Sequence, residues 1–459
     1  MKNFKLLFFI SILILSCKTE DPDISNTGTN PTGTNSDVPI IIPDGTERYL
    51  NLDSDYIFDQ DKLPTFELEL SEDALKRIDD DPTAEEYVEG SMTFEGETIS
   101  PVGIRYKGSI GAYVGCLSGL DWANPSGHKT CTKLSMKVKI NWEGREEKFY
   151  GLKKIQLHSQ NNDDSQMRDR MAYWLFREMG VPAPRAIHAR LLINGDFVGL
   201  FSLVEQIDGR FTRYNYNDGE GNLYKEVWPL TAAGNVQSTI NLKDALRTNE
   251  DDNPSVDLMR TFAQEIIDAD DNSIKSVIAN YMNVNEIISY AVVDRTIRAD
   301  DGAFHWYCNG GCSNHNYYWY EEPNNNRIHL IPWDMDNTFE NIIFPANPVT
   351  PIADGWGEIS NNCEPFSSGL FGILQRSAAC DKLTAGWVKF EDEFEQLKTQ
   401  FIEGPLAESE TDALLDAWTA QIYEATEEAN NIHDDAITIN QWENAVQTLK
   451  SQLKHAREN

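Results

Sequence analysis

The sequence predicts an α+β fold of two lobes, the first rich in strands and the second rich in helices. The chain has 459 residues, which is long enough for two lobes with separate cores. Alternating apolar and polar residues, typical of half-buried strands, recur up to Glu205, and helical periodicity dominates from Ser255 onward. We expect the strand-rich lobe to span residues 60–205 and the helical lobe residues 206–459.

The N-terminus has the pattern of a bacterial lipoprotein signal. Two lysines precede the apolar run Leu6–Leu15, which is too short to span a bilayer as a mature helix. The sequence Ile14-Leu15-Ser16-Cys17 then resembles a lipobox. We expect residues 1–16 to be a signal peptide and Cys17 to carry the lipid, with a plain secretory signal as the alternative. Residues 17–43 are polar and predict a flexible tether.

The formal net charge of −35 at pH 7 restricts the class of partner. It argues against binding to nucleic acid or to an anionic membrane surface, because both need basic patches. A basic protein substrate fits this charge, and a Ser/Thr-rich protein is the other partner that we expect. Contact with the membrane is expected through the lipid anchor only. A nucleotide would need a local group of Lys or Arg, together with metal ions. The expected location is the extracytoplasmic face of the bacterial cell envelope, at the outer membrane or cell surface.

Cysteine usage agrees with export. Of the seven cysteines, one is Cys17, and an even number remains, which in an exported chain predicts disulfides. Closure of short loops favours Cys116–Cys131, Cys308–Cys312 and Cys363–Cys380, although other pairings stay open. None of these cysteines has the spacing of a zinc ribbon.

The strand-rich half contains several local signals. Phe66–Leu70 alternates apolar and acidic residues as a half-buried strand does, and Ser71 is placed to cap a short helix. Strands are expected at residues 87–94 and 102–106. Asn194-Gly195 between two apolar runs is the strongest hairpin signal in the chain.

Helices are predicted from stripes of buried residues and from their end signals. The first long helix is expected to start at Asp164-Ser165 and to end at Gly180. Asn283, with Glu286 three residues later, has the form of a capping box. Later helices are expected at residues 381–401, 408–429 and 441–457.

Two basic segments of the first half are candidates for contact with phosphate. Arg105 and Lys107 precede a Gly-Ser turn whose backbone N–H groups suit phosphate oxygens, with an ordinary turn as the alternative. Lys133, Lys137 and Lys139 fall on one face of a predicted strand. That face is either a solvated strand edge or the source of a lysine that reaches a nucleotide phosphate.

The main candidate site lies between residues 299 and 340. Asp301 sits at a turn after a helical pattern, Asn316 opens an aromatic strand, and Asp334 closes the next apolar strand. Carboxylates and an amide are hard oxygen ligands that suit Mg²⁺ or Mn²⁺ with a phosphate-bearing substrate. We predict a phosphoryl-transfer site with Asp301 as base and the other two residues as metal ligands. Ordinary turns and a Ca²⁺ loop remain the alternatives.

Taken together, these segments resemble the CotH-like kinases, the family named for spore coat protein H, which are secreted relatives of protein kinases. The resemblance extends from about Phe66 to Phe339. It depends on an ordered set of motifs, namely Arg105-x-Lys107-Gly-Ser, Lys133-x-Ser-x-Lys137, Asn161–Arg170, Ile193-Asn-Gly195-Asp-Phe-x-Gly199-Leu-Phe-x-Leu-x-Glu205, Gly221-Asn-Leu-Tyr-Lys225, Asp301-Gly, His315-Asn316-Tyr-Tyr-x-Tyr320 and Ile331-Pro-Trp333-Asp334-x-Asp336.

The resemblance implies an atypical protein-kinase-like fold and a role for each matching acidic residue. Asp301 matches the catalytic aspartate, which accepts the proton of the attacking hydroxyl. Asp334 matches the metal-binding aspartate of the Asp-Phe-Gly segment, and Asn316 falls where the second metal ligand is expected.

The resemblance also implies a nucleotide side of the site. Lys133 or Lys137 would be the strand lysine on the phosphates, and Arg105-x-Lys107-Gly-Ser would replace the Gly-rich loop. Glu205 would lie at the hinge between the lobes, near the base of the bound nucleotide. The implied cofactors are Mg²⁺ or Mn²⁺, with ATP as substrate.

One feature departs from ordinary kinases, which keep the catalytic Asp and Asn within one short loop. Here the separation is 316 − 301 = 15 residues, and the extra residues include Cys308 and Cys312. If this insertion folds out as a hairpin, Asp301 and Asn316 still meet. If it does not, Asp300 and Asp294 are rival candidates for the base.

We therefore expect a lipid-anchored, extracytoplasmic kinase that phosphorylates Ser or Thr of a secreted or surface protein. The alternative is a catalytically inactive kinase-like scaffold that holds Ca²⁺ in its acidic loops. A carbohydrate-binding role, with Trp306, Trp319 and Trp333 as stacking faces, ranks third, because tryptophans in strands usually belong to the core.

Overall fold

The computed structural model describes residues 53–121, 124–299, 301–339, 356–359, 361–368 and 373–458. The predicted signal peptide, Cys17 and tether lie outside these ranges, and so does Asp300. Within the described ranges, no helix has both the length and the apolar character that a membrane crossing requires.

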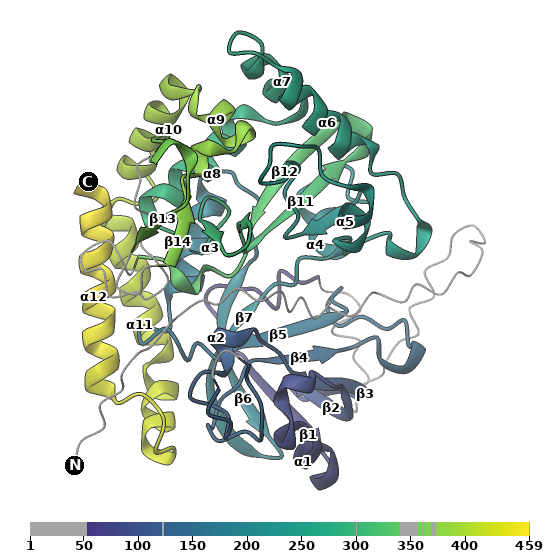
Figure 1. The fold of residues 1–459 in the computed structure, drawn as a ribbon. Coiled ribbons are helices and arrows are strands. Elements are labelled where there is room, and N and C mark those ends of the chain that lie inside the picture. Colours follow the sequence, from purple (N-terminus) through teal and green to yellow (C-terminus); the bar gives the residue numbers. More distant parts are fainter. Residues whose placement is uncertain are drawn as a thin grey trace.

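The strands of the N-terminal half close into a barrel, drawn in purple to blue in Figure 1. Their order around the barrel is β1-β2-β3-β4-β5-β7-β6, and the barrel closes where β1 pairs parallel with β6. Side chains of alternate residues fill the interior, so that Phe66, Met92 and Leu203 are fully buried. The strands are β1 Thr65–Leu70, β2 Val88–Phe94, β3 Glu97–Tyr106, β4 Met136–Lys139, β5 Lys154–His158, β6 Ala186–Ile193 and β7 Asp196–Val204.

Several predicted local signals are confirmed in this half. Asn194 and Gly195 have φ angles of 53° and 86°, as the two-residue turn between β6 and β7 requires. Ser71 caps α1 (Glu72–Asp80) by accepting a hydrogen bond from the N–H of Ala74. A short helix, α2 (Ile110–Tyr113), follows β3.

The helix α3 (Arg168–Glu178) lies between β5 and β6 in the chain but starts later than predicted. Asp163 accepts hydrogen bonds from the N–H groups of Ser165 and Arg168, which ties residues 163–168 into a turn that precedes the helix. The predicted start at Asp164-Ser165 was therefore wrong. The predicted end is confirmed, because Gly180 follows the helix with a φ angle of 74°.

The C-terminal half contains two small sheets and most of the helices (Figure 1). One sheet has the order β12-β11-β8, and the other has the order β10-β9-β14-β13. The strands are β8 Leu223–Lys225, β9 Trp306–Cys308, β10 Cys312–Ser313, β11 Tyr317–Glu322, β12 Arg327–Pro332, β13 Phe366–Ser368 and β14 Ile373–Arg376. The helices are α4 Gly209–Asn215, α5 Thr239–Asp244, α6 Asp257–Asp268, α7 Ile274–Tyr281, α8 Val284–Ile297, α9 Lys382–Val388, α10 Glu391–Glu403, α11 Glu408–Ile432 and α12 Ile439–Glu458. The fold is thus α+β and compatible with the two lobes of a kinase, as predicted.

Two predictions in this half need correction. The helix expected over residues 381–401 is two helices, α9 and α10, because the backbone at Phe390 leaves the helical region and buries its ring. Asn283 caps α8 as predicted, by accepting from the N–H of Glu286. The carboxylate of Glu286, however, pairs with His329 at 2.8 Å, so this contact replaces the second half of a capping box.

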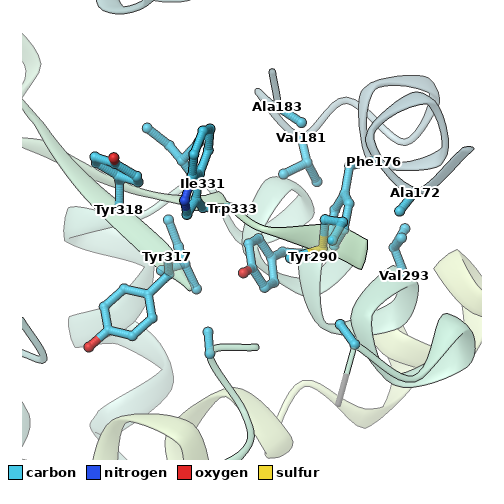
Figure 2. Packing of buried hydrophobic residues seen from close by; sticks show 14 of the residues in the cluster. Ala172, Phe176, Val181, Ala183, Tyr290, Val293, Tyr317, Tyr318, Ile331 and Trp333 are labelled. Atoms are coloured by element: carbon cyan, nitrogen blue, oxygen red, sulfur yellow. The ribbon is translucent and has the colours of Figure 1, made fainter. Parts of the chain in front are cut away.

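The helix α3 belongs to the core of the C-terminal half. Figure 2 shows Ala172 and Phe176 of α3 beside Tyr290 and Val293 of α8. The barrel interior forms a separate hydrophobic cluster. Since α3 is connected directly to β5 and β6, it fixes how the barrel meets the helical half.

Arg170 joins three parts of the molecule from within α3. Its guanidinium is fully buried and donates to the backbone oxygen of Gln60 at 2.7 Å, to Nδ1 of His188 at 2.9 Å and to Oε1 of Gln421 at 2.8 Å. It also lies 4.2 Å from the ring centre of Trp418 in α11.

We expect Arg170→Ala to lower the free energy of unfolding by about 3 kcal/mol, because several buried acceptors lose their donor at once. Chemical denaturation measures this change. Arg213→Ala is the matched control, since Arg213 is exposed and its contact with Glu220 is 3.6 Å long, and it should change stability by less than about 1 kcal/mol. Equal effects of the two variants would contradict the assigned role of Arg170.

Candidate active site

The antiparallel pairing of β11 with β12 places Asn316 next to the segment that contains Asp334. Tyr317 pairs with Pro332, and the N–H of Trp333 donates to the backbone oxygen of Asn316 at 3.1 Å. Asn316 and Asp334 both have left-handed backbones, with φ angles of 58° and 57°. Such angles are uncommon outside glycine, and Asn and Asp adopt them more readily than other residues. The start of one strand and the end of the next therefore present both side chains at one end of the hairpin.

Asp301 meets Asn316 directly. The chain leaves α8 through a turn in which the N–H of Gly302 donates to the backbone oxygen of Ala299 at 3.0 Å. Nδ2 of Asn316 donates to Oδ2 of Asp301 at 2.9 Å and to the backbone oxygen of Asp301 at 3.0 Å. The structure thus joins the predicted base and a predicted metal ligand, although they are 15 residues apart.

Of the two possibilities that the sequence left open for the residues between them, the structure has the hairpin. β9 and β10 pair antiparallel, with Cys308 opposite Cys312, and a disulfide joins these two residues. The other two predicted disulfides, Cys116–Cys131 and Cys363–Cys380, are also present. The insertion is therefore a closed hairpin, and it leaves Asp301 and Asn316 together at its base.

Two further carboxylates, Asp169 and Asp336, lie at the site. Oδ1 of Asp169, in the first turn of α3, accepts from the N–H of Met335 at 3.0 Å. The hydroxyl of Tyr173, also in α3, accepts from the N–H of Asp334 at 3.0 Å. α3 therefore holds the segment that carries Asp334 and Asp336.

The electrostatics of these carboxylates follow from burial. Burial raises the pKa of Asp301 to about 6, helped by the charges of Asp334 and Glu226. Burial raises the pKa of Asp169 to about 7. Burial and the charge of Asp169 raise the pKa of Asp334, and burial and the charge of Asp334 raise the pKa of Asp336 far above its usual range. Several acidic groups share a region of low dielectric, and a bound cation would stabilise their charged forms.

This donor set fits a divalent cation bound together with a phosphate. Within the part of the chain that the structure describes, no three or more His, Cys, Asp or Glu side chains form a metal site by themselves. Mg²⁺ in phosphoryl-transfer sites takes one or two carboxylates and completes its shell with water and substrate phosphates. The carboxylate of Asp334 and the amide oxygen of Asn316 suit that partial set.

Lys107 supplies positive charge to the same site from the barrel. Its Nζ donates to Oε1 of Gln156 at 2.9 Å, lies 2.8 Å from Nε2 of His158, and is 5.5 Å from the ring centre of Trp333. Burial and the charge of Lys107 lower the pKa of His158 to about 3, so that the imidazole is neutral. The charge of Lys107 also offsets part of the rise in the pKa of Asp334.

Of the other predicted nucleotide-side residues, Lys137 lies near Lys107, since its charge also lowers the pKa of His158, whereas the remaining three have separate partners. Arg105 pairs with Glu85. Lys137 is buried in β4, opposite Arg105 in β3 and Gln156 in β5. Lys133 and Glu205 have partners elsewhere. Nζ of Lys133 donates to the backbone oxygen of Leu200 at 2.8 Å, and the carboxylate of Glu205 pairs with Arg185 at 2.6 Å.

Sequence reasoning missed three residues at the site. His158 lies at the end of β5, whose sequence Lys-Ile-Gln-Leu-His alternates in the manner of a strand and was an available signal. Glu226 accepts from the N–H of Asn316 at 3.3 Å, and it directly follows the recognised motif ending at Lys225. Asp169 falls within the matched segment Asn161–Arg170 but was given no role, because an acidic residue in a first helical turn is common.

Comparison with known proteins decides the family. The family model described as CotH kinase protein matches residues 104–458, which is well over half of the chain. The chain belongs to the CotH kinase family. Its match contains Asp301, Asn316 and Asp334, so the site described above lies within the part shared with CotH kinases.

A curated relative supports the same assignment over a short stretch. The chain is 39% identical over 62 residues to the inner spore coat protein H-like protein of Bacillus subtilis (strain 168). This stretch is 14% of this chain and 19% of the relative, so the chain matches only about a fifth of that protein's length.

Proposed function

We propose that this CotH kinase transfers the γ-phosphate of ATP to Ser or Thr of a secreted or surface protein, and that it acts outside the cytoplasm from a lipid anchor at Cys17. The observation that carries the proposal is the meeting of Asp301, Asn316 and Asp334 at one buried site, although they come from three separate segments. Phosphoryl transfer depends on positioning and charge neutralisation rather than on covalent catalysis, and this site offers both.

In the proposed reaction, the oxygen of the substrate hydroxyl attacks the γ-phosphorus of ATP while Asp301 accepts the hydroxyl proton. The bond between the γ-phosphorus and the β-phosphate oxygen breaks, and ADP leaves. A pKa of about 6 suits a base that works near neutral pH. Asn316 holds this carboxylate through Nδ2 and, with Asp334, would bind the metal. Bound Mg²⁺ or Mn²⁺ would neutralise charge on the phosphates. Lys107 adds a fixed cation on the barrel side.

The proposed location and partner rest on chain-wide properties. Three disulfides fit a protein of an oxidising compartment. The net charge of −35 would attract a basic protein substrate and repel an acidic one.

We expect radiolabel from γ-labelled ATP to be incorporated into a basic, Ser-containing test protein when Mg²⁺ or Mn²⁺ is present. Chelation by EDTA should reduce incorporation to background, because the carboxylate site would then lack its cation. Scintillation counting of the separated test protein measures the result. Absence of label with either metal, together with Ca²⁺ binding and no nucleotide binding, would overturn the proposal in favour of the Ca²⁺-holding scaffold.

A further inference from the structure

We propose that Tyr307, carried on the disulfide-closed hairpin β9–β10, is a positioning residue that orients the carboxylate of Asp301 for phosphoryl transfer. This inference rests on the proposed function. The insertion between Asp301 and Asn316 would then contribute a side chain to the active site.

The hairpin is too small to hold its shape alone. β9 spans Trp306–Cys308 and β10 spans Cys312–Ser313, and two-stranded hairpins of this size are marginal in water. Two features hold it. The Cys308–Cys312 disulfide joins the strands beside the turn, and β9 also pairs with β14, where Gln375 lies opposite Tyr307.

The base of the hairpin is fastened to the loop that contains Asp301. Nδ2 of Asn314 donates to the backbone oxygen of Ala303 at 2.6 Å, and the hydroxyl of Tyr317 donates to Oδ1 of Asn314 at 3.0 Å. The two ends of the hairpin are therefore joined to each other at Ala303, two residues after Asp301.

The side chain of Tyr307 points inward and contacts Asp301. It is 2% exposed, and its hydroxyl donates a hydrogen bond to the Asp301 carboxylate. Its ring stacks on His305 with 4.4 Å between ring centres and lies 5.9 Å from the ring of His315. These neighbours leave the ring little freedom, so the position of the hydroxyl is set by the hairpin.

Two donors thus act on one carboxylate. Nδ2 of Asn316 comes from the residue before β11, and the hydroxyl of Tyr307 comes from β9. A carboxylate held by one donor can rotate about its Cβ–Cγ bond, whereas two donors from separate segments define its plane. A base must lie within hydrogen-bond reach of the proton that it accepts, and small errors of placement are costly in rate.

The test compares Tyr307→Phe with Tyr290→Phe in the full chain, using the transfer assay above. Tyr290 is the matched control, because it is a buried tyrosine of the same half whose hydroxyl has no hydrogen-bond partner among the described residues. We expect Tyr307→Phe to lower kcat about 10- to 100-fold with KM for ATP unchanged, since the hydroxyl acts on the base and not on the nucleotide. Tyr290→Phe should leave both constants within about twofold.

A second variant tests the hairpin. Replacing Cys308 and Cys312 together by Ser should also lower kcat and leave KM for ATP unchanged. The inference would be overturned if Tyr307→Phe had the kcat of wild type. It would also be overturned if KM for ATP rose by as large a factor as kcat fell. If wild type transfers phosphate and Asp301→Asn does not, either of these outcomes for Tyr307→Phe overturns the role of Tyr307 and leaves the proposed function intact. If wild type transfers none, the proposed function fails and this inference fails with it.

Discussion

Asp301→Asn is expected to lower kcat for phosphoryl transfer about a thousandfold, while the affinity for ATP stays within about twofold. The amide has the same shape as the carboxylate, and its oxygen can still accept from Nδ2 of Asn316 as Oδ2 of Asp301 does at 2.9 Å. The variant therefore keeps the site's geometry and loses only the group that accepts the proton. Initial rates with γ-labelled ATP measure kcat, and isothermal titration with ATP and Mg²⁺ measures affinity.

The matched control is Asp294→Asn. Asp294 is also a fully buried aspartate, near the end of α8, where its Oδ1 lies 3.3 Å from Nε of Arg295. Sequence reasoning left it as a rival base. We expect this variant to keep at least about a third of wild-type kcat, because its side chain pairs with Arg295 rather than with Asn316. The assignment of the base is wrong if Asp301→Asn stays active and Asp294→Asn does not.

Asp334→Ala is expected to abolish the dependence of ATP binding on Mg²⁺ and to reduce transfer about a thousandfold or more. Asp334 is the carboxylate that lies both beside Asn316 and within the field of Lys107. Without Asp334 the site would bind the cation less well. The negative phosphates of the nucleotide would then face the carboxylates of Asp169 and Asp336 with less positive charge between them. Titration calorimetry with ATP, in Mg²⁺ and in EDTA, measures the effect.

Wild type should bind ATP at least about tenfold more tightly in Mg²⁺ than in EDTA, and Asp334→Ala should bind equally weakly in both. Asp244→Ala, which removes an exposed aspartate at the end of α5, should behave as wild type does. Unchanged Mg²⁺-dependent binding in Asp334→Ala would exclude Asp334 as the ligand.

Local signals in the sequence predicted local structure well. Asn194-Gly195 forms its turn, Ser71 caps its helix, and the cysteines close the short loops between sequence neighbours. The meeting of Asn316 with Asp334 was also within reach, because two strands joined by a tight connection pair with each other and bring their outer ends together.

What the sequence could not supply was the arrangement across the barrel. Lys107, Gln156 and His158 meet only because β4 lies between β3 and β5, and the register of that sheet is set by packing rather than by any local motif. The same limit explains Lys133, which shares a motif with Lys137 but turns to the backbone of Leu200 in β7. It also explains Asp169, which reaches the site through the packing of α3 against the C-terminal half.

A crystal structure with Mg²⁺ and a non-hydrolysable ATP analogue would show whether Asp301, Asn316 and Asp334 surround one cation and the terminal phosphate. We expect a cation about 2.1 Å from a carboxylate oxygen of Asp334 and from the amide oxygen of Asn316, with the terminal phosphate between this cation and Asp301. Nucleotide bound at a distant surface, with Asp301 and Asp334 in contact with neither metal nor phosphate, would contradict this expectation.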